Sequence, residues 1–289
     1  MSPSATGRSH TGPLGRRERV RAPFGRRRAP VLSNQAVGAY RVLGAVDLSG
    51  PSPDPGQFYM LAAAEGWGAG ADERPFLGRA FSFMRTTRAA SGEGVELEFL
   101  LEAVGPGTAR LGSLGPGDEL WLTGPLGVGF GVLGEARPAL LVAGGVGIAP
   151  LAAWQDELRR DGRPAAALLG FRDEEHAAAV ALLDEVQVAT DDGSSGHRGL
   201  VTELLSAALD ADPSVTVYAC GPPPMLEAVR AMCAERRVPA ELALESGMAC
   251  GFGACYGCVV ATRDGYLRVC VDGPVIDAAQ LDSALGDHP

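Results

Sequence analysis

Short apolar runs separated by glycine and proline turns fill the chain from residue 33 to residue 135. Turns such as Gly50-Pro51, Pro55-Gly56 and Gly115-Pro116-Gly117 interrupt the pattern at short intervals. Short strands with this punctuation are typical of a small antiparallel barrel. We therefore expect a β-barrel domain over residues 33–135. The runs predict strands at Tyr40–Val46, Gln57–Ala62, Val95–Leu101 and Glu119–Leu122.

The pattern changes after residue 135, where apolar runs alternate with stretches of helical period. Such alternation predicts a doubly wound parallel α/β sheet, which we place at residues 136–239. Residues 240–289 are rich in cysteine and glycine and too few to form much of a core of their own. The expected strands of the sheet are Ala139–Ala143, Ala165–Leu169, Glu185–Thr190 and Val215–Ala219, and the expected helices are Pro150–Arg160, Glu174–Leu183, Val201–Leu209 and Pro224–Arg236.

The start of the chain has a different charge from the rest. Residues 1–30 carry eight arginines and one acid, Glu18, whereas the whole chain has a net charge of −10. Because this segment has no apolar period, we expect residues 1–32 to be a disordered basic tail. An arm that binds nucleic acid or another anion is the functional alternative to a solvated extension. We favour the extension, since the acidic remainder argues against nucleic acid as a main partner.

Composition sets the remaining bounds. The 289 residues, 46% hydrophobic and 21% charged, suit two compact domains and a small module. The chain contains no run of 18 apolar residues, so no membrane-spanning helix is predicted. No apolar segment follows the arginine-rich start, as one would in a secretory signal. We therefore expect a cytoplasmic protein without membrane contact. All 25 basic residues are arginine, which excludes a catalytic lysine.

Four of the six cysteines crowd into 21 residues near the C-terminus. Cys250, Cys255 and Cys258 have the spacing C-x4-C-x2-C, and Cys270 follows. This is the plant-type [2Fe–2S] spacing. Three thiolates from one short loop require a tightly curled backbone, and the interspersed glycines permit it. A run at Tyr266–Cys270 predicts a strand that returns the fourth cysteine to the loop.

A structural zinc site is the alternative for these cysteines. Zinc sites usually combine two C-x2-C knuckles, and only one half of this motif has that form. We therefore favour the iron–sulfur interpretation. Disulfides are disfavoured by the expected compartment. Cys233 is expected to be a core residue.

A glycine turn in the predicted α/β sheet is a candidate nucleotide site, although by itself it is a weak signal and does not have the G-x-G-x-x-G pattern. Gly144, Gly145, Val146 and Gly147 follow a buried strand, and Pro150 suits the first position of a helix. Such a turn exposes backbone amides and a helix N-terminus to a phosphate. Thr190-Asp191-Asp192-Gly193 and Cys220-Gly221-Pro222 also end strands. Since ligands bind at the carboxyl ends of open α/β sheets, the three loops are expected to lie together.

The barrel segment has two weaker ligand signals. The first is Arg79-Ala80-Phe81-Ser82, where the arginine could pair with a pyrophosphate and Ser82 could contact a flavin. The second is Gly107 and Thr108, a small-residue turn before a helix that suits phosphate binding. Each is also compatible with an ordinary surface residue or turn. The order in which the barrel, nucleotide and cysteine motifs follow one another along the chain indicates the class of protein more specifically than any single motif does.

With these motifs in order, the chain resembles the electron-transfer subunit of type B dihydroorotate dehydrogenase, in the ferredoxin-NADP reductase-like superfamily. The resemblance covers roughly Ser33 to Leu281 and leaves the basic tail unmatched. Besides the segments above, it rests on two further motifs, Val104-Gly-x-Gly-Thr108 and Gly124-Pro-Leu-Gly-x-Gly-Phe130.

The resemblance implies FAD in the barrel, NAD(H) at the sheet and a [2Fe–2S] cluster in the C-terminal module. It assigns the cluster to Cys250, Cys255, Cys258 and Cys270. Two departures stand out. The family often has Arg-Pro-Ile-Ser where this chain has Arg79-Ala-Phe-Ser82, and it tends to have an arginine in place of Glu102. The implied flavin contacts are Arg79, Ala80, Phe81, Ser82, Leu100, Leu101, Glu102, Gly107 and Thr108.

The implied function is an electron relay rather than a complete enzyme, so no residue is assigned as catalytic. Electrons from dihydroorotate would pass from an FMN-containing catalytic subunit through the cluster and FAD to NAD⁺, in pyrimidine (UMP) biosynthesis. The expected assembly is a heterotetramer with two copies of each subunit. A reductase subunit serving a ferredoxin, a hydrogenase or a sulfur compound is the alternative. A non-catalytic zinc or redox-sensing protein is a third possibility.

Overall fold

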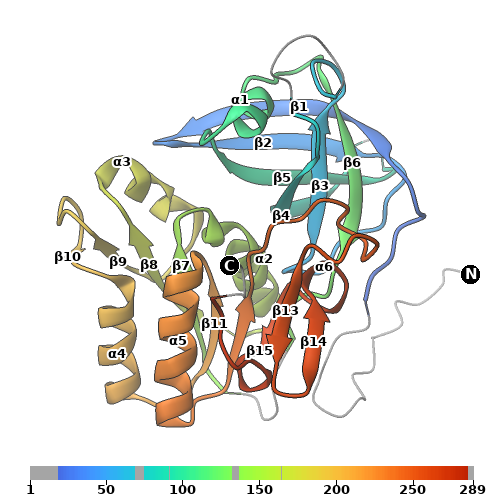
Figure 1. Cartoon of the computed structure of the whole chain (residues 1–289). Helices are drawn as coiled ribbons and strands as arrows, with labels where there is room; N and C mark the ends of the chain where they lie inside the picture. Colours follow the sequence, from blue (N-terminus) through green and yellow to red (C-terminus); the bar gives the residue numbers. More distant parts are fainter. Residues whose placement is uncertain (1–18, 69–74, 91, 132–136, 164, 286–289) are drawn as a thin grey trace, which may run out of the picture.

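The computed structural model describes residues 19–68, 75–90, 92–131, 137–163 and 165–285. Three parts are visible in Figure 1: a barrel above, an α/β sheet flanked by helices below, and a small cysteine-bearing hairpin in front. The barrel and the parallel sheet confirm the fold class expected from the sequence.

The barrel is a closed ring of six antiparallel strands in the order β1-β2-β5-β4-β3-β6. Alternation places Tyr59, Phe83 and Phe99 inside, each at most 1% exposed. A short helix, α1 (Pro106–Gly112), follows β5. The four predicted strands are confirmed and two are added. The strands are β1 (Arg27–Val37), β2 (Tyr40–Asp47), β3 (Phe58–Ala63), β4 (Arg79–Arg88), β5 (Val95–Glu102) and β6 (Glu119–Leu126).

The prediction of a disordered tail over residues 1–32 is wrong for its described part. Strand β1 begins at Arg27 and pairs with β2 and β6. The Arg27 guanidinium bonds to both carboxylate oxygens of Asp47, whose side chain is fully buried. A run of arginines looks solvated in the sequence, but one of them here neutralises an acid inside the fold. Residues 1–18 lie outside the described part.

Replacing Asp47 tests whether its ion pair with Arg27 stabilises the attachment of β1 to the barrel. Asp47→Ala leaves the Arg27 guanidinium, 12% exposed, without its partner, and breaking such a buried pair costs about 3–5 kcal/mol. We expect urea unfolding to show a loss of that size. The matched control is Glu119→Ala, which removes the partner of the half-exposed Arg28 and costs less than about 1 kcal/mol. Equal losses in the two variants would contradict the assignment.

The second part is a seven-stranded sheet in the order β10-β9-β8-β7-β11-β12-β15. Its strands are parallel except β15, which pairs antiparallel with β12. The strands are β7 (Ala139–Gly144), β8 (Ala165–Phe171), β9 (Val186–Thr190), β10 (His197–Arg198), β11 (Thr216–Cys220), β12 (Ala240–Ala243) and β15 (Val275–Asp277).

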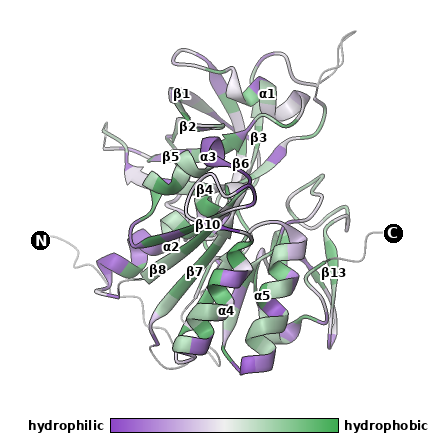
Figure 2. Ribbon diagram, turned by 90° about the vertical axis from the view of Figure 1, so that its left-hand side faces the viewer, coloured by the Kyte–Doolittle hydropathy of each residue, from purple (hydrophilic) through white to green (hydrophobic). Residues whose placement is uncertain are grey.

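Helices cover both faces of this sheet, as a doubly wound fold requires. Helix α2 (Ile148–Arg160) packs on one face, through a cluster that includes Trp154 and Leu141. Helices α4 (Val201–Ala211) and α5 (Pro223–Arg236) pack on the other, around Val142. Figure 2 shows the apolar strands β7 and β8 beside the helices that cover them. None of the helices in the described residues is long and apolar enough to cross a membrane.

Three local predictions in this part need correction. Helix α2 begins at Ile148, so Pro150 is its third residue. The helix expected over Glu174–Leu183 is a short helix, α3 (Glu174–Ala177), followed by a 3-10 segment (Ala178–Leu182). The C-terminal residues are less separate than expected, because β12 and β15 extend the sheet.

The cysteine-bearing part is built on the hairpin β13 (Val259–Thr262) and β14 (Gly265–Arg268). A helical turn, α6 (Val269–Asp272), follows, and a 3-10 turn (Ala278–Gln280) comes after β15. Cys270 lies within α6 rather than at the end of a strand, which corrects the prediction for Tyr266–Cys270. The hairpin buries Val260 in the same apolar cluster as α4 and α5, so it shares the core of the sheet.

Candidate functional site

The four C-terminal cysteines lie in two pairs. Cys258 and Cys270 are buried with their sulfurs 3.2 Å apart, and the amide of Cys270 points at the Cys258 sulfur. Cys250 is half-buried and Cys255 is exposed, and these two thiols interact with each other. The backbone fixes the first pair, because the Val269 amide donates to the Cys258 carbonyl and joins α6 to the loop.

The loop that carries the first three cysteines directs backbone amides at sulfur. Gly251 and Gly253 adopt φ of +76° and +88°, which suits glycine and turns the loop. Burial alone would raise the pKa of Cys250, but amides from Cys255, Phe252 and Ala254 outweigh it and lower the pKa to about 6. These amides form an anion-binding concavity of the kind that holds iron–sulfur clusters.

The four thiols of the motif supply sulfur donors only. Across the described ranges, no group of three or more Cys, His, Asp or Glu side chains is gathered as the ligands of one metal ion would be. Two sulfur pairs suit two iron atoms joined by sulfide. Burial and the adjacent Cys258 raise the pKa of Cys270 to about 12, so metal binding must displace a proton there.

The two predicted flavin segments meet at the edge of the barrel. A Cβ on Gly107 would lie 2.7 Å from Nε of Arg79, so the start of α1 and the start of β4 are in contact. The Arg79 guanidinium bonds to the Leu77 carbonyl and lies 5.8 Å from the Trp67 ring centre. The Thr108 hydroxyl accepts from the amides of Val104 and Gly105. Ala80 is exposed, and Phe81 and Ser82 are partly exposed along β4.

The other predicted flavin contacts lie deeper. Leu100 and Leu101 are each 1% exposed, so their side chains belong to the core and only their backbone could contact a ligand. The Glu102 carboxylate is directed at the α/β sheet, 3.3 Å from Arg172 and 3.4 Å from His176. Glu102 therefore links the barrel to the second domain.

Two of the three predicted nucleotide loops lie together at the carboxyl ends of the parallel strands, whereas Thr190-Asp191-Asp192-Gly193 follows β9, which is separated from β7 by β8. A Cβ on Gly147 would lie 2.2 Å from the Cys220 carbonyl, and one on Gly144 would lie 2.8 Å from Pro222. Gly145 has φ of +54°, and a Cβ there has no neighbour closer than 3.8 Å. Val146 is half-buried. Gly144 to Gly147 therefore pack against Cys220 to Pro222, with Gly145 facing open space.

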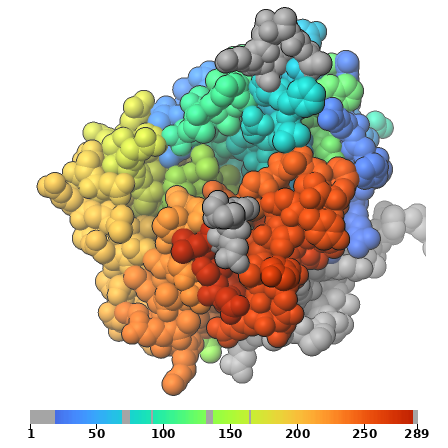
Figure 3. All heavy atoms as spheres, in the orientation of Figure 1, coloured from blue at the N-terminus to red at the C-terminus, as the bar shows by residue number. Residues whose placement is uncertain are grey.

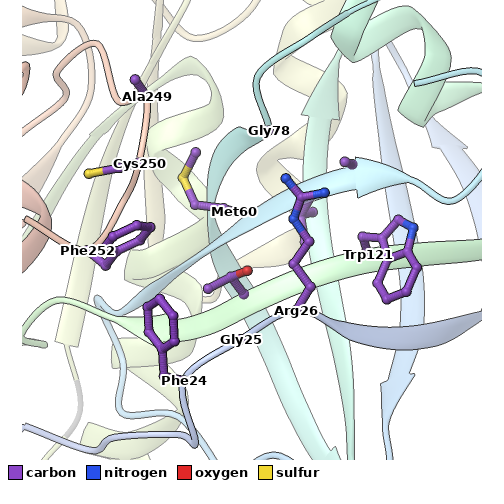
Figure 4. A pocket seen from close by; sticks show the side chains of 12 residues that line it. Phe24, Gly25, Arg26, Met60, Gly78, Trp121, Ala249, Cys250 and Phe252 are labelled. Atoms are coloured by element: carbon purple, nitrogen blue, oxygen red, sulfur yellow. The ribbon is translucent and has the colours of Figure 1, made fainter. Parts of the chain in front are cut away.

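A cavity of about 450 Å³ lies between the barrel and the cysteine loop. Met60 of β3 and Gly78, next to Arg79, line one side, and Cys250 and Phe252 line the other (Figure 4). The loop packs closely here, since a Cβ on Gly251 would lie 2.6 Å from Met60. The cavity thus joins the start of the predicted flavin segment to the first predicted cluster ligand.

Sequence reasoning missed three residues at these sites. In the part of the chain that the structure describes, the Trp67 indole nitrogen, the Ser246 hydroxyl and Nε of Arg19 are buried and have no hydrogen-bond partner. Trp67 faces Arg79, and Ser246 precedes the cysteine loop. A tryptophan between two glycines was the signal for the first. The others had no local signal, because burial of these residues depends on distant segments.

Fold and site together define a reductase of the ferredoxin reductase type with an added iron–sulfur module. The family model for the iron-sulfur cluster binding domain of dihydroorotate dehydrogenase B matches residues 245–282, and the oxidoreductase NAD-binding domain matches residues 141–231. The chain belongs to the family of dihydroorotate dehydrogenase B electron transfer subunits. This favours iron and sulfide over zinc at the cysteines.

Relatives named "dihydroorotate dehydrogenase B (NAD(+)), electron transfer subunit" match over most of their length. The protein of Caldanaerobacter subterraneus subsp. tengcongensis is 36% identical over 88% of this chain and 97% of its own. That of Clostridium perfringens is 34% identical over 78% of this chain and 86% of its own.

Solved structures agree on the fold. An NADH-dependent reduced ferredoxin-NADP oxidoreductase has a TM-score of 0.72 at 24% identity, covering 88% of this chain and 90% of its own. The ferredoxin reductase of a carbazole 1,9a-dioxygenase has a TM-score of 0.61 at 26% identity, covering 74% and 66%.

Proposed function

We propose that this chain is an electron-transfer subunit that connects NAD(H) to a dihydroorotate dehydrogenase catalytic subunit through FAD and a [2Fe–2S] cluster. The cavity between Gly78 and Cys250 carries the proposal, because it brings the predicted flavin segment and the cysteine loop to one place. The printed names of the relatives support the reaction and the partner.

The chemistry requires both groups. FAD exchanges hydride with a nicotinamide and single electrons with an iron–sulfur cluster. The chain's own residues would hold and separate them. Arg79 and the amides around Gly107 suit a pyrophosphate, and Gly145 leaves room for a nucleotide to approach the glycine turn. The four cysteines, Cys250, Cys255, Cys258 and Cys270, would bind the cluster.

The partner would carry FMN and the dihydroorotate site. The exposed position of Cys255 supports a cluster near the surface, where a partner can approach it. We propose two copies of each subunit in the assembly and a cytoplasmic location.

The test is reconstitution with and without the partner. Anaerobically purified protein is expected to contain about two irons and two sulfides per chain and one flavin. Alone, it should oxidise NADH with an artificial one-electron acceptor but leave dihydroorotate unchanged. Mixed with the catalytic subunit of the same organism, it should couple dihydroorotate oxidation to NAD⁺ reduction. Iron and flavin without this coupling would point to another partner, such as a ferredoxin, and a zinc protein without flavin would overturn the proposal.

A further inference from the structure

The segment from Arg19 to Arg26, which we call the N-terminal strap, runs along the cysteine-bearing part before β1 begins. Figure 1 shows the first described residues (dark blue) descending from the barrel beside the C-terminal hairpin, and in Figure 3 the N-terminal residues (blue) adjoin the C-terminal part (orange). The Phe24 ring packs edge-on against Phe252, with ring centres 5.3 Å apart at 89°. Phe252 belongs to the loop between Cys250 and Cys255, so the strap contacts the loop that would hold the cluster.

A buried glutamine fixes the start of the strap. The Gln57 side chain is fully buried and donates to the carbonyls of Val20, at 3.0 Å, and Gly127, at 2.8 Å. Gly127 in turn lies against Gly273, since a Cβ on Gly127 would be 2.4 Å from the Gly273 carbonyl. Gly273 directly follows α6, the helical turn that contains Cys270. Arg19 directly precedes Val20, and its guanidinium is close enough to Cys270 and Asp272 to interact electrostatically with both.

The guanidinium of Arg19 carries one buried N–H from which an electron-rich group can accept. Its Nε is buried and has no hydrogen-bond partner among the described residues, which is costly unless another group accepts from it. Burial and the neighbouring Arg21 lower the pKa of Arg19, while Cys270 and Asp272 raise it. An arginine stays charged in proteins. Arg26, at the other end of the strap, is also positively charged, and it lines the same cavity as Cys250.

We propose that Arg19 tunes the cluster: its positive charge and its unpaired Nε–H stabilise the extra electron of the reduced state and raise the reduction potential. The inference rests on the cluster of the proposed function but not on the partner. Charge and hydrogen bonds to sulfur are among the features that set iron–sulfur potentials. A four-cysteine cluster becomes more negative by one charge on reduction, so a nearby cation favours the reduced form.

The experiment is a redox titration of the purified holoprotein, followed by the electron paramagnetic resonance signal of the reduced cluster. Arg19→Gln is expected to shift the cluster equilibrium about tenfold toward the oxidised state, a potential lower by about 59 mV for one electron. Arg19→Lys keeps the charge and should stay closer to the original potential. Arg28→Gln is the matched control, because Arg28 pairs with Glu119 and lies over Trp121 on the barrel.

Each outcome decides the proposal. An ordered series, with the lowest potential in Arg19→Gln and an unchanged one in Arg28→Gln, supports it. Loss of the cluster from Arg19→Gln with retention in Arg19→Lys also supports a role of the charge. Equal potentials in all variants overturn it, and so does loss of the cluster from both Arg19 variants, since the side chain would then act on folding. A wild-type protein without iron would instead overturn the proposed function.

Discussion

Cys258→Ala should abolish the cluster and leave the flavin in place. Cys258 is 2% exposed, its sulfur lies 3.2 Å from that of Cys270, and the two cysteines outside the motif, Cys220 and Cys233, lie in β11 and α5. Iron and sulfide analysis should therefore fall from about two of each to near zero. NADH should still reduce the flavin, because the predicted FAD and NAD sites are built from other segments, but electrons should no longer reach the partner.

The control for this prediction is Cys233→Ala. Cys233 is also buried, at 1% exposure, but it lies in α5 within the apolar cluster. Burial raises the pKa of its thiol to about 12, as expected for an inert core cysteine. This variant should keep the full cluster and lose only about 1 kcal/mol of stability or less, since little volume is removed. A normal iron content in Cys258→Ala would show that the ligand assignment is wrong.

Local motifs carried most of what the sequence could predict. Glycine turns, apolar strands and the C-x4-C-x2-C spacing each act over fewer than a dozen residues, so their structure follows from neighbouring positions. The fold class, the four barrel strands and the carboxyl-end placement of Gly144 and Cys220 were accessible for that reason. Parallel strands joined by helices leave few alternatives for where such loops meet.

Features that depend on contacts between segments far apart in the chain could not be predicted from the sequence. The basic run at Arg26–Arg28 looks solvated until Asp47 and Glu119 are seen to pair with it. Val20, which follows Arg19, is held by a hydrogen bond from Gln57, a fully buried residue from a distant segment. The orientation of Glu102 likewise depends on how the two domains pack. Long-range burial and charge pairing, rather than local propensity, explain these misses.

Arg79→Gln is expected to have the second largest effect, a loss of FAD affinity of about 10- to 100-fold. A hydrogen bond to a charged group contributes about 1.5–3 kcal/mol, and 1.4 kcal/mol corresponds to a factor of ten. The Arg79 guanidinium lies against Gly107 at the start of α1 and near the Trp67 ring. It is thus placed where a pyrophosphate could contact both an arginine and the backbone of a small-residue turn. Equilibrium dialysis of the apoprotein with FAD measures the change.

The matched control uses an arginine of α1, the helix that Arg79 contacts at Gly107. Arg110→Gln removes an exposed side chain that bonds to the Glu65 carbonyl, much as Arg79 bonds to the Leu77 carbonyl, but it does not pack against Gly107. FAD affinity should therefore change less than about twofold, because a surface substitution of this kind has small effects. The cluster should remain in both variants, since no cysteine ligand contacts α1. If Arg79→Gln and Arg110→Gln retained FAD equally well, the flavin pyrophosphate would have to lie elsewhere on the barrel, and the cavity at Gly78 would lose its place between the two cofactors.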